Sequence, residues 1–258
     1  MKPYEQVIKE RYDGREIDQQ MSENIYSIIN PIGFHGHLSI ESAVYKIFQF
    51  LISKNIDITT IKILDVGCGS GWITRLFAEF KGHPSNIVGI DLSDYRIQTA
   101  KKFSQCIEYI NGDIVKGHNF NTKFDLITAF DVLMHFDTED ILNKALTNIY
   151  KNLNAEGGIF VWYDAYAKDH FDCPTNSECN GFNSKQMDAL AESVGFKKVN
   201  EFSFYKYFLG KHSLYLYNKI PVTLVKILEN IIPGNPGNII KIYSKWEDHV
   251  YPSNSHLH

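Results

Sequence analysis

A glycine-rich segment with an acidic residue at its start is the feature of this sequence best suited to binding a ligand. It reads Asp65-Val-Gly-Cys-Gly-Ser-Gly71 and lies between an apolar run at 61–66 and a helix-like stretch at 72–80. Glycines let a ligand approach the backbone, and the start of a following helix offers free N–H groups to a polar or anionic group. Dinucleotide-binding folds use a similar turn, but their fingerprint requires a small residue where Trp72 stands. An acidic residue at position 65 suits a ligand that carries an ammonium group.

Side chains that could move protons follow two later apolar runs. Asp131 and His135 come after the run at 124–130. The run at 157–163 ends in, or is followed by, four more polar side chains: Tyr163, Asp164, Tyr166 and His170. Histidine titrates near neutral pH, so His135 is our first candidate for a general base and His170 the second, with Asp164 able to orient an imidazole. A purely structural role for His135, at a turn or as a helix cap, fits the same position.

Alternating strand-like and helix-like segments position these residues. Strands are predicted at 61–66, 86–91, 106–110, 124–130 and 157–163, and helices at 72–80, 94–103, 139–153 and 184–194, with Ser93 and Thr138 as caps. This order predicts a doubly wound α/β fold with a mostly parallel sheet. Segments 196–208 and 211–217 predict a closing antiparallel hairpin.

The remaining segments predict one domain with additions at both ends. Residues 1–55 are expected to form an N-terminal helical cover, and 56–218 the core, with a polar lid at 164–183. Residues 219–258 are expected to add an amphipathic helix, a turn and a second helical stretch. The apolar side of the tail helix would pack on the domain or form a dimer, so we expect a monomer or a homodimer.

Composition and charge limit the expected binding partners and the expected cellular location of the protein. The 258 residues are 44% hydrophobic and carry 26 Lys+Arg against 30 Asp+Glu, a net charge of −4. Without a basic stripe we expect no nucleic-acid partner, and without a long apolar run we expect no membrane span. A polar N-terminal segment and four cysteines predict a cytoplasmic protein with free thiols. The spacing of His170, Cys173 and Cys179 matches no common zinc pattern, so no metal is predicted.

In their order along the chain, several motifs resemble those of class I S-adenosylmethionine-dependent methyltransferases. ILDVGCGSG resembles the first motif, VGIDLS the second-strand motif, INGDI the third, and FDLITAFDVLMHF the fourth; LNAEGGIFVWY and GFKKV also fit. The resemblance implies a seven-stranded Rossmann-like sheet with an antiparallel last strand. It also implies that the glycines and Asp65 hold the methionine end of the cofactor, that Asp91 takes the ribose hydroxyls, and that Asp113 accepts from the adenine amino group. The cofactor-binding residues implied are Asp65, Gly67, Cys68, Gly69, Gly71, Asp91, Leu92, Asp113, Ile114, Phe130 and Val132.

The resemblance does not identify the methyl acceptor, but the absence of known motifs excludes several acceptor classes. The Asn/Asp-Pro-Pro-Tyr, Pro-Cys and paired-glutamate signatures of other acceptor classes are missing. We therefore predict methylation of an oxygen on a small polar metabolite, such as a sugar or nucleotide-linked sugar in surface-polysaccharide or natural-product biosynthesis. A small-molecule amine is the alternative. Expected acceptor contacts are His35, His37, Tyr163 and Tyr166, with Tyr4 and Tyr12 in the same cover.

Three further alternatives stay open. Asp131 and Asp164 stand where metal-assisted relatives place carboxylates, but the paired Asp-Asn pattern of those relatives is absent. A protein that binds S-adenosylmethionine without catalysis would keep the cofactor motifs and lose the acid–base groups. A nicotinamide-dependent oxidoreductase would bind NAD instead.

Overall fold

Seven strands form one sheet in the order β3-β2-β1-β4-β5-β7-β6. The computed structural model describes residues 4–17, 31–136, 138–166, 182–206, 220–232 and 236–245. The strands are β1 (Ile63–Val66), β2 (Ile87–Asp91), β3 (Glu108–Asn111), β4 (Leu126–Phe130), β5 (Ile159–Ala165), β6 (Lys197–Lys206) and β7 (Pro236–Ser244). Strands β1 to β5 pair in parallel, and β7 runs antiparallel to both β5 and β6. The doubly wound α/β fold with an antiparallel last strand is confirmed.

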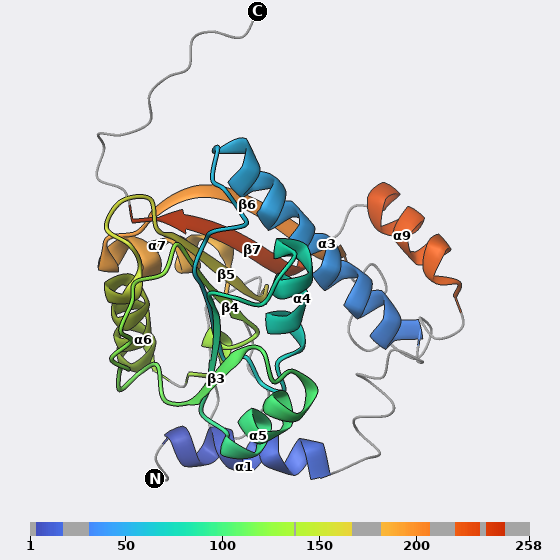
Figure 1. Ribbon diagram of the computed structural model, residues 1–258. Helices are drawn as coiled ribbons and strands as arrows, with labels where there is room; N and C mark the ends of the chain where they lie inside the picture. Colours follow the sequence, from blue (N-terminus) through green and yellow to red (C-terminus); the bar gives the residue numbers. More distant parts are fainter. Residues whose placement is uncertain are drawn as a thin grey trace, which may run out of the picture.

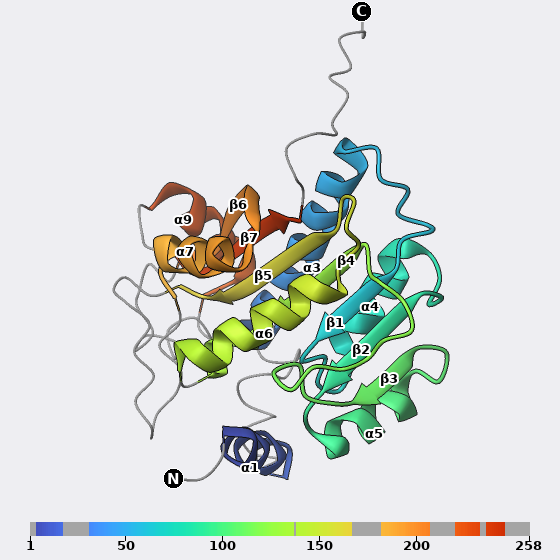
Figure 2. The same ribbon diagram turned by 90° about the vertical axis from the view of Figure 1, so that its left-hand side faces the viewer.

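Helices cover both faces of the sheet (Figures 1 and 2). They are α1 (Tyr4–Ile17), α3 (Pro31–Ser53), α4 (Trp72–Lys81), α5 (Asp94–Phe103), the short 3-10 helix η1 (Leu133–His135), α6 (Glu139–Asn152), α7 (Ser184–Val194) and α9 (Val222–Ile231). Neighbouring residues of β1 show how the two cores arise. Ile63 packs with α3, α4 and α5, whereas Leu64 packs with α6 and α7, because successive strand residues point to opposite faces. None of the helices in the described ranges is long and apolar enough to cross a membrane.

Side-chain caps fix where three helices begin. The Ser93 hydroxyl accepts from the Arg96 amide at 3.2 Å, and the Thr138 hydroxyl accepts from the Ile141 amide at 3.3 Å. Both caps were predicted from the sequence and are confirmed. Asn183 caps α7 in the same way. These caps set the entry of α5 and α6 just beyond the carboxyl ends of β2 and β4.

The closing strand differs from the sequence prediction. Strand β6 pairs with β7 at 236–244, and not with 211–217, a segment that lies outside the described residues. The second helical stretch that we predicted in the tail is therefore wrong, although the helix before it is present as α9. A strand enclosed on both sides shows an apolar run without strict alternation, here interrupted by Lys241, and is easily mistaken for helix. The sheet consequently extends beyond residue 218, the limit that we predicted for the core.

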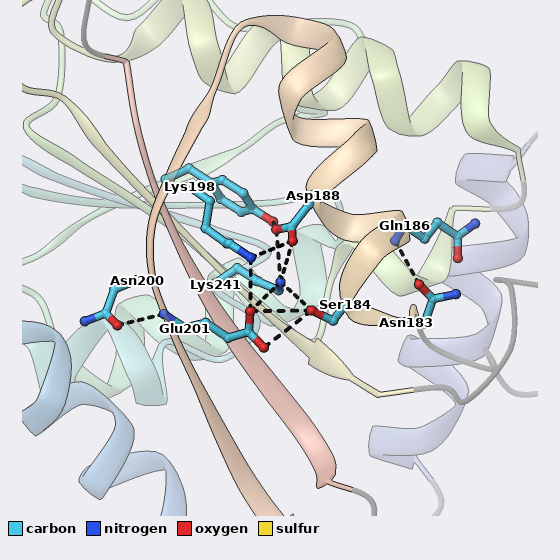
Figure 3. A network of polar contacts seen from close by, with 9 residues as sticks. Asn183, Ser184, Gln186, Asp188, Lys198, Asn200, Glu201 and Lys241 are labelled. Atoms are coloured by element: carbon cyan, nitrogen blue, oxygen red, sulfur yellow. Dashed lines mark hydrogen bonds and ion pairs between the residues drawn. The ribbon is translucent and has the colours of Figure 1, made fainter. Parts of the chain in front are cut away.

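A buried lysine ties α7, β6 and β7 together (Figure 3). The Lys241 side chain is fully buried, and its Nζ donates to Ser184 Oγ at 2.6 Å, to both Asp188 oxygens at 2.9 Å and to Glu201 Oε2 at 2.7 Å. Lys198 bonds the same two carboxylates from the surface. A buried ammonium needs this degree of pairing, because an unpaired charge in the interior is costly.

Candidate active site

The loop after β1 has a shape that requires glycine. Gly67, Gly69 and Gly71 have φ angles of 67°, 52° and 77°, a left-handed conformation that side chains disfavour. A Cβ at Gly67 would lie 2.2 Å from Val132 Cγ2, and one at Gly71 would lie 2.5 Å from the Tyr109 hydroxyl. These two glycines therefore allow Val132 and Tyr109 to pack directly against the backbone of the loop. Helix α4 begins at the residue after Gly71, so its first N–H groups lie at the end of the loop.

Asp65 lies beneath this loop, in β1. It is buried, and its two oxygens accept from the Thr74 hydroxyl at 2.6 Å and the Thr128 hydroxyl at 2.9 Å. Burial raises the pKa of Asp65 to about 6, against the lowering effect of the two hydroxyls. Each carboxylate oxygen keeps a second lone pair for a ligand donor. The contact of Asp65 with a cofactor amino group stays a prediction, but the carboxylate is held rigidly for it.

Asp91 links the glycine loop to α5. Its Oδ2 accepts from the Gly69 amide at 2.8 Å and its Oδ1 from the Ser93 amide at 2.8 Å. Burial raises the pKa of Asp91, although these two amides and Arg96 oppose that rise. The carboxylate is thereby fixed at the end of β2, with one oxygen toward the loop.

Helix α1 lies across this edge of the sheet, beside α5 and β3 (Figures 1 and 2). Asp113, which follows β3, accepts from the Val115 amide at 2.8 Å through Oδ1 and from the Tyr4 hydroxyl through Oδ2. The Ser93 hydroxyl donates to Asp13 Oδ1 at 2.5 Å. The N-terminal helix thus contacts Asp113, which is predicted to bind the adenine, and Ser93, the cap of α5, and no sequence motif indicates these contacts.

The same helix reaches the candidate base. The Tyr12 hydroxyl forms a hydrogen bond with His135 Nε2, and the two rings meet edge to face with centroids 5.1 Å apart. The Arg96 guanidinium lies over the Tyr12 ring, 4.5 Å from its centroid. His135 is therefore paired with a phenol. If His135 accepts a proton from an acceptor, its Nε2 does so while hydrogen-bonded to the Tyr12 hydroxyl.

Two carboxyl groups stand side by side at the ends of β4 and β5. Phe130 and Tyr163 are register partners, so Asp131 and Asp164 follow at the next positions of the two strands. Asp131 has a φ of 53°, a conformation found mostly in glycine, Asn and Asp. Surrounding protein atoms raise the pKa of Asp131 to about 7, although its side chain keeps solvent-accessible surface. Asp164 is fully buried, and burial followed by repulsion from Asp131 raises its pKa well above the ordinary value.

The remaining predicted acceptor contacts are dispersed. His35 is buried within α3, and the His37 ring contacts the Trp72 ring at 4.0 Å between centroids, next to the glycine loop. Tyr163 is buried and stacked on Phe130 at 4.9 Å, which is a core contact. The acceptor roles of these residues stay predictions.

Several other predicted positions can be located only in part. Tyr166 follows β5 and forms an isolated bridge with Phe182. His170, Cys173, Cys179 and most of the 164–183 lid lie outside the described residues. Of the other cofactor residues, Cys68 and Ile114 are buried, and Leu92 follows β2. Within the described ranges, no three His, Cys, Asp or Glu side chains gather in a way that could hold a metal ion.

The strand order, the antiparallel β7 and the glycine loop after β1 define the architecture of class I S-adenosylmethionine-dependent methyltransferases. Residues 63–157 match the family model of a methyltransferase domain. The magnesium protoporphyrin IX methyltransferase of Synechocystis PCC 6803, solved with bound S-adenosylmethionine, superposes with a TM-score of 0.64. It is 12% identical, and the match covers 95% of this chain and 98% of that one. An S-adenosylmethionine-dependent methyltransferase from Clostridium acetobutylicum superposes with a TM-score of 0.54 at 16% identity, over 78% and 89% of the two chains.

Curated relatives match less than half of this chain. Sterol 24-C-methyltransferase of Yarrowia lipolytica is 30% identical over 118 residues, 43% of this chain and 29% of that protein. The enzyme of the same name from Kluyveromyces lactis is 33% identical over 122 residues, 45% and 31% of the two chains. The chain thus spans less than a third of the length of these relatives. Residues 63–157 therefore match a methyltransferase domain, and the chain has the fold of class I methyltransferases.

Proposed function

We propose that this protein transfers a methyl group from S-adenosylmethionine to a small molecule. The observation that carries the proposal is a row of site residues along one sheet edge. The glycine loop follows β1, Asp65 and Asp91 lie in β1 and β2, and Asp113 follows β3. The loop suits a close ligand, because three glycines with positive φ angles leave its backbone without side chains just before α4 begins. Fixed carboxylates fit the ammonium and hydroxyl groups of the cofactor.

The protein's own residues would bind the cofactor, orient the acceptor and remove a proton from it. When bound, S-adenosylmethionine supplies a methyl group on a sulfonium that is activated for in-line displacement. The backbone of the loop and Asp65 would hold its amino-acid end, Asp91 its ribose, and Asp113 its adenine. Helix α1 would exclude water at this edge, since Tyr4 and Tyr12 contact Asp113 and His135. Alignment of the acceptor and exclusion of water account for much of catalysis in such a transfer.

The proposal must also say which kind of atom accepts the methyl group. The sequence analysis predicts an oxygen of a polar metabolite such as a sugar, but none of the relatives named above bears a sugar in its name. Two are named for carbon 24 of a sterol and one for magnesium protoporphyrin IX. The sterol enzymes align over less than half of this chain. The acceptor must therefore be inferred from the groups at the ends of β4 and β5.

Two titrations and one assay test the proposal. Calorimetry should show binding of S-adenosylhomocysteine and none of NAD. Incubation with S-adenosylmethionine labelled in the methyl group should transfer label to at least one compound of a panel of amines, alcohols, sugars and sterols. Binding of NAD alone would overturn the assignment. Cofactor binding without transfer would indicate a binding protein; one fold neighbour, the [4+2]-cyclase SpnF, is named for an activity other than methyl transfer.

A further inference from the structure

Among the described residues, none forms an ion pair with the carboxyl group of Asp131 or of Asp164. The β7 partner of Asp164 is Ile239, which is uncharged. Asp65, another buried carboxylate of the site, also lacks an ion pair, but both of its oxygens accept hydrogen bonds from hydroxyl groups.

One oxygen of the pair is buried without a partner. Asp164 Oδ2 accepts from the Trp162 indole at 2.5 Å and from the Met134 amide at 3.1 Å. The Val132 amide also faces this carboxyl group. Asp164 Oδ1 has no hydrogen-bond partner, although the residue is fully buried. A buried oxygen left in this way costs stability unless a proton or a ligand satisfies it.

Electrostatics indicates how many charges the pair carries. Burial, and then repulsion from Asp131, raise the pKa of Asp164 well above its ordinary value, which favours a proton on this group and a single negative charge on the pair. Asp131 keeps solvent-accessible surface and is the group that a ligand can reach. Such a site is matched to a ligand with a single positive charge.

We propose that Asp131 and Asp164 form the acceptor-binding site and that the acceptor is an amine, bound as its ammonium ion. This rests on the proposed function, because it names the substrate class for the same active site. Asp131 would contact the ammonium directly. Asp164 would be a positioning residue that holds Asp131 through the shared proton. A neutral alcohol or an alkene carbon gains no comparable attraction from the pair.

The transfer then balances without a further reactant. The ammonium gives one proton to the Asp131 carboxylate, which leaves a neutral amine with a free electron pair. That pair forms the bond to the methyl carbon while the carbon–sulfur bond breaks and its electrons stay on sulfur. The nitrogen ends with the positive charge that the sulfonium loses.

Matched acceptors and matched variants test this proposal. The panel pairs each amine with its alcohol, including amino sugars with their parent sugars, and uses methyl-labelled S-adenosylmethionine. We expect kcat/KM for the favoured amine to exceed that of its alcohol by at least about tenfold. Asp131→Asn keeps a residue that tolerates a positive φ, and should lower kcat/KM by about 10- to 100-fold, as expected for loss of a charged hydrogen bond. Asp140→Asn removes an exposed carboxylate of α6 and should change neither activity nor cofactor binding.

The split between kinetic constants separates the two carboxyl groups. Asp131→Asn should raise KM and lower kcat, whereas Asp164→Asn, whose amide oxygen can keep both donors, should lower mainly kcat. Both variants should bind S-adenosylhomocysteine within about threefold of the wild type, which shows that they fold. Transfer to alcohols or carbon in preference to amines, or full activity of Asp131→Asn, would overturn the amine proposal and leave the methyltransferase proposal intact. Absence of transfer to every acceptor class would overturn both.

Discussion

Replacing Lys241 with methionine should destabilise the protein through the loss of one buried charge. The Lys241 side chain is fully buried, whereas its partners Asp188 and Glu201 are 19% and 35% exposed (Figure 3). Removing one partner of a buried ion pair costs about 3–5 kcal/mol, because the other charge is left uncompensated. Here water reaches both carboxylates and Lys198 continues to pair with them. We therefore expect a loss of about 2–3 kcal/mol, somewhat below that range.

Lys198 provides the matched control for this prediction. It bonds the same Asp188 and Glu201, but its side chain is 36% exposed. Exposed ion pairs contribute about 0–1 kcal/mol, so Lys198→Met should cost less than 1 kcal/mol. Urea denaturation followed by tryptophan fluorescence measures both variants, and thermal melts should show a drop of roughly 4–10 °C for Lys241→Met. Equal losses for the two variants would refute the reasoning, because burial would then make no difference.

The stability lost in Lys241→Met should also depend on pH and should become smaller in acid. Burial raises the pKa of Asp188 and of Glu201, but the hydrogen bonds and charges of Lys198 and Lys241 outweigh burial and lower both. The unfolded chain consequently binds protons on these groups more readily than the folded one. Their stabilisation is complete above the unfolded pKa values of about 4 and is lost as the pH falls through the lower folded values. The difference between wild type and Lys241→Met should shrink below about pH 4, and a constant difference would contradict the assignment.

Three further predictions concern the cofactor edge. Gly67→Ala should weaken S-adenosylhomocysteine binding at least about tenfold, since φ is 67° and the new Cβ would collide with Val132. Gly82→Ala is the control: its Cβ has open space around it, so binding should be unchanged and the stability should fall by only about 1 kcal/mol. Asp91→Asn should weaken that binding by about 10- to 100-fold through loss of charged acceptors, and calorimetry checks both variants. Asp13→Ala should loosen α1, because the hydrogen bond from Ser93 is lost. Limited trypsin digestion within α1 should then be faster, and an unchanged rate would show that other contacts hold the helix.

The sequence predicts the parallel half of the fold well for a physical reason. Strands β1, β2, β4 and β5 are short apolar runs that end in polar or glycine residues, and the helices between them carry capping residues such as Ser93 and Thr138. Both signals are local, because burial on two faces and the need to satisfy helix N–H groups act within a few residues. The fold class follows from the order of these elements.

Strand β7 and the role of α1 could not be predicted because they depend on distant partners. Lys241 interrupts the apolar run of β7, and only the carboxylates of α7 and β6 make its burial possible. The positions of Tyr4 and Tyr12 depend on Asp113 and His135, more than a hundred residues away. Neither pair leaves a pattern in the nearby sequence. The sequence named the candidate base, but it could not indicate that a phenol from another element is bonded to it.

These long-range contacts bear on how the two ends of the site work together. Tyr4 and Tyr12 lie eight residues apart on α1, which is about 12 Å along a helix. One rigid helix therefore touches the predicted adenine position and the predicted acid–base residue at once. Loosening α1 should then impair cofactor binding and proton transfer together, whereas a change at Asp131 should affect the acceptor alone. The cofactor side and the acceptor side of the site are thus separable by experiment.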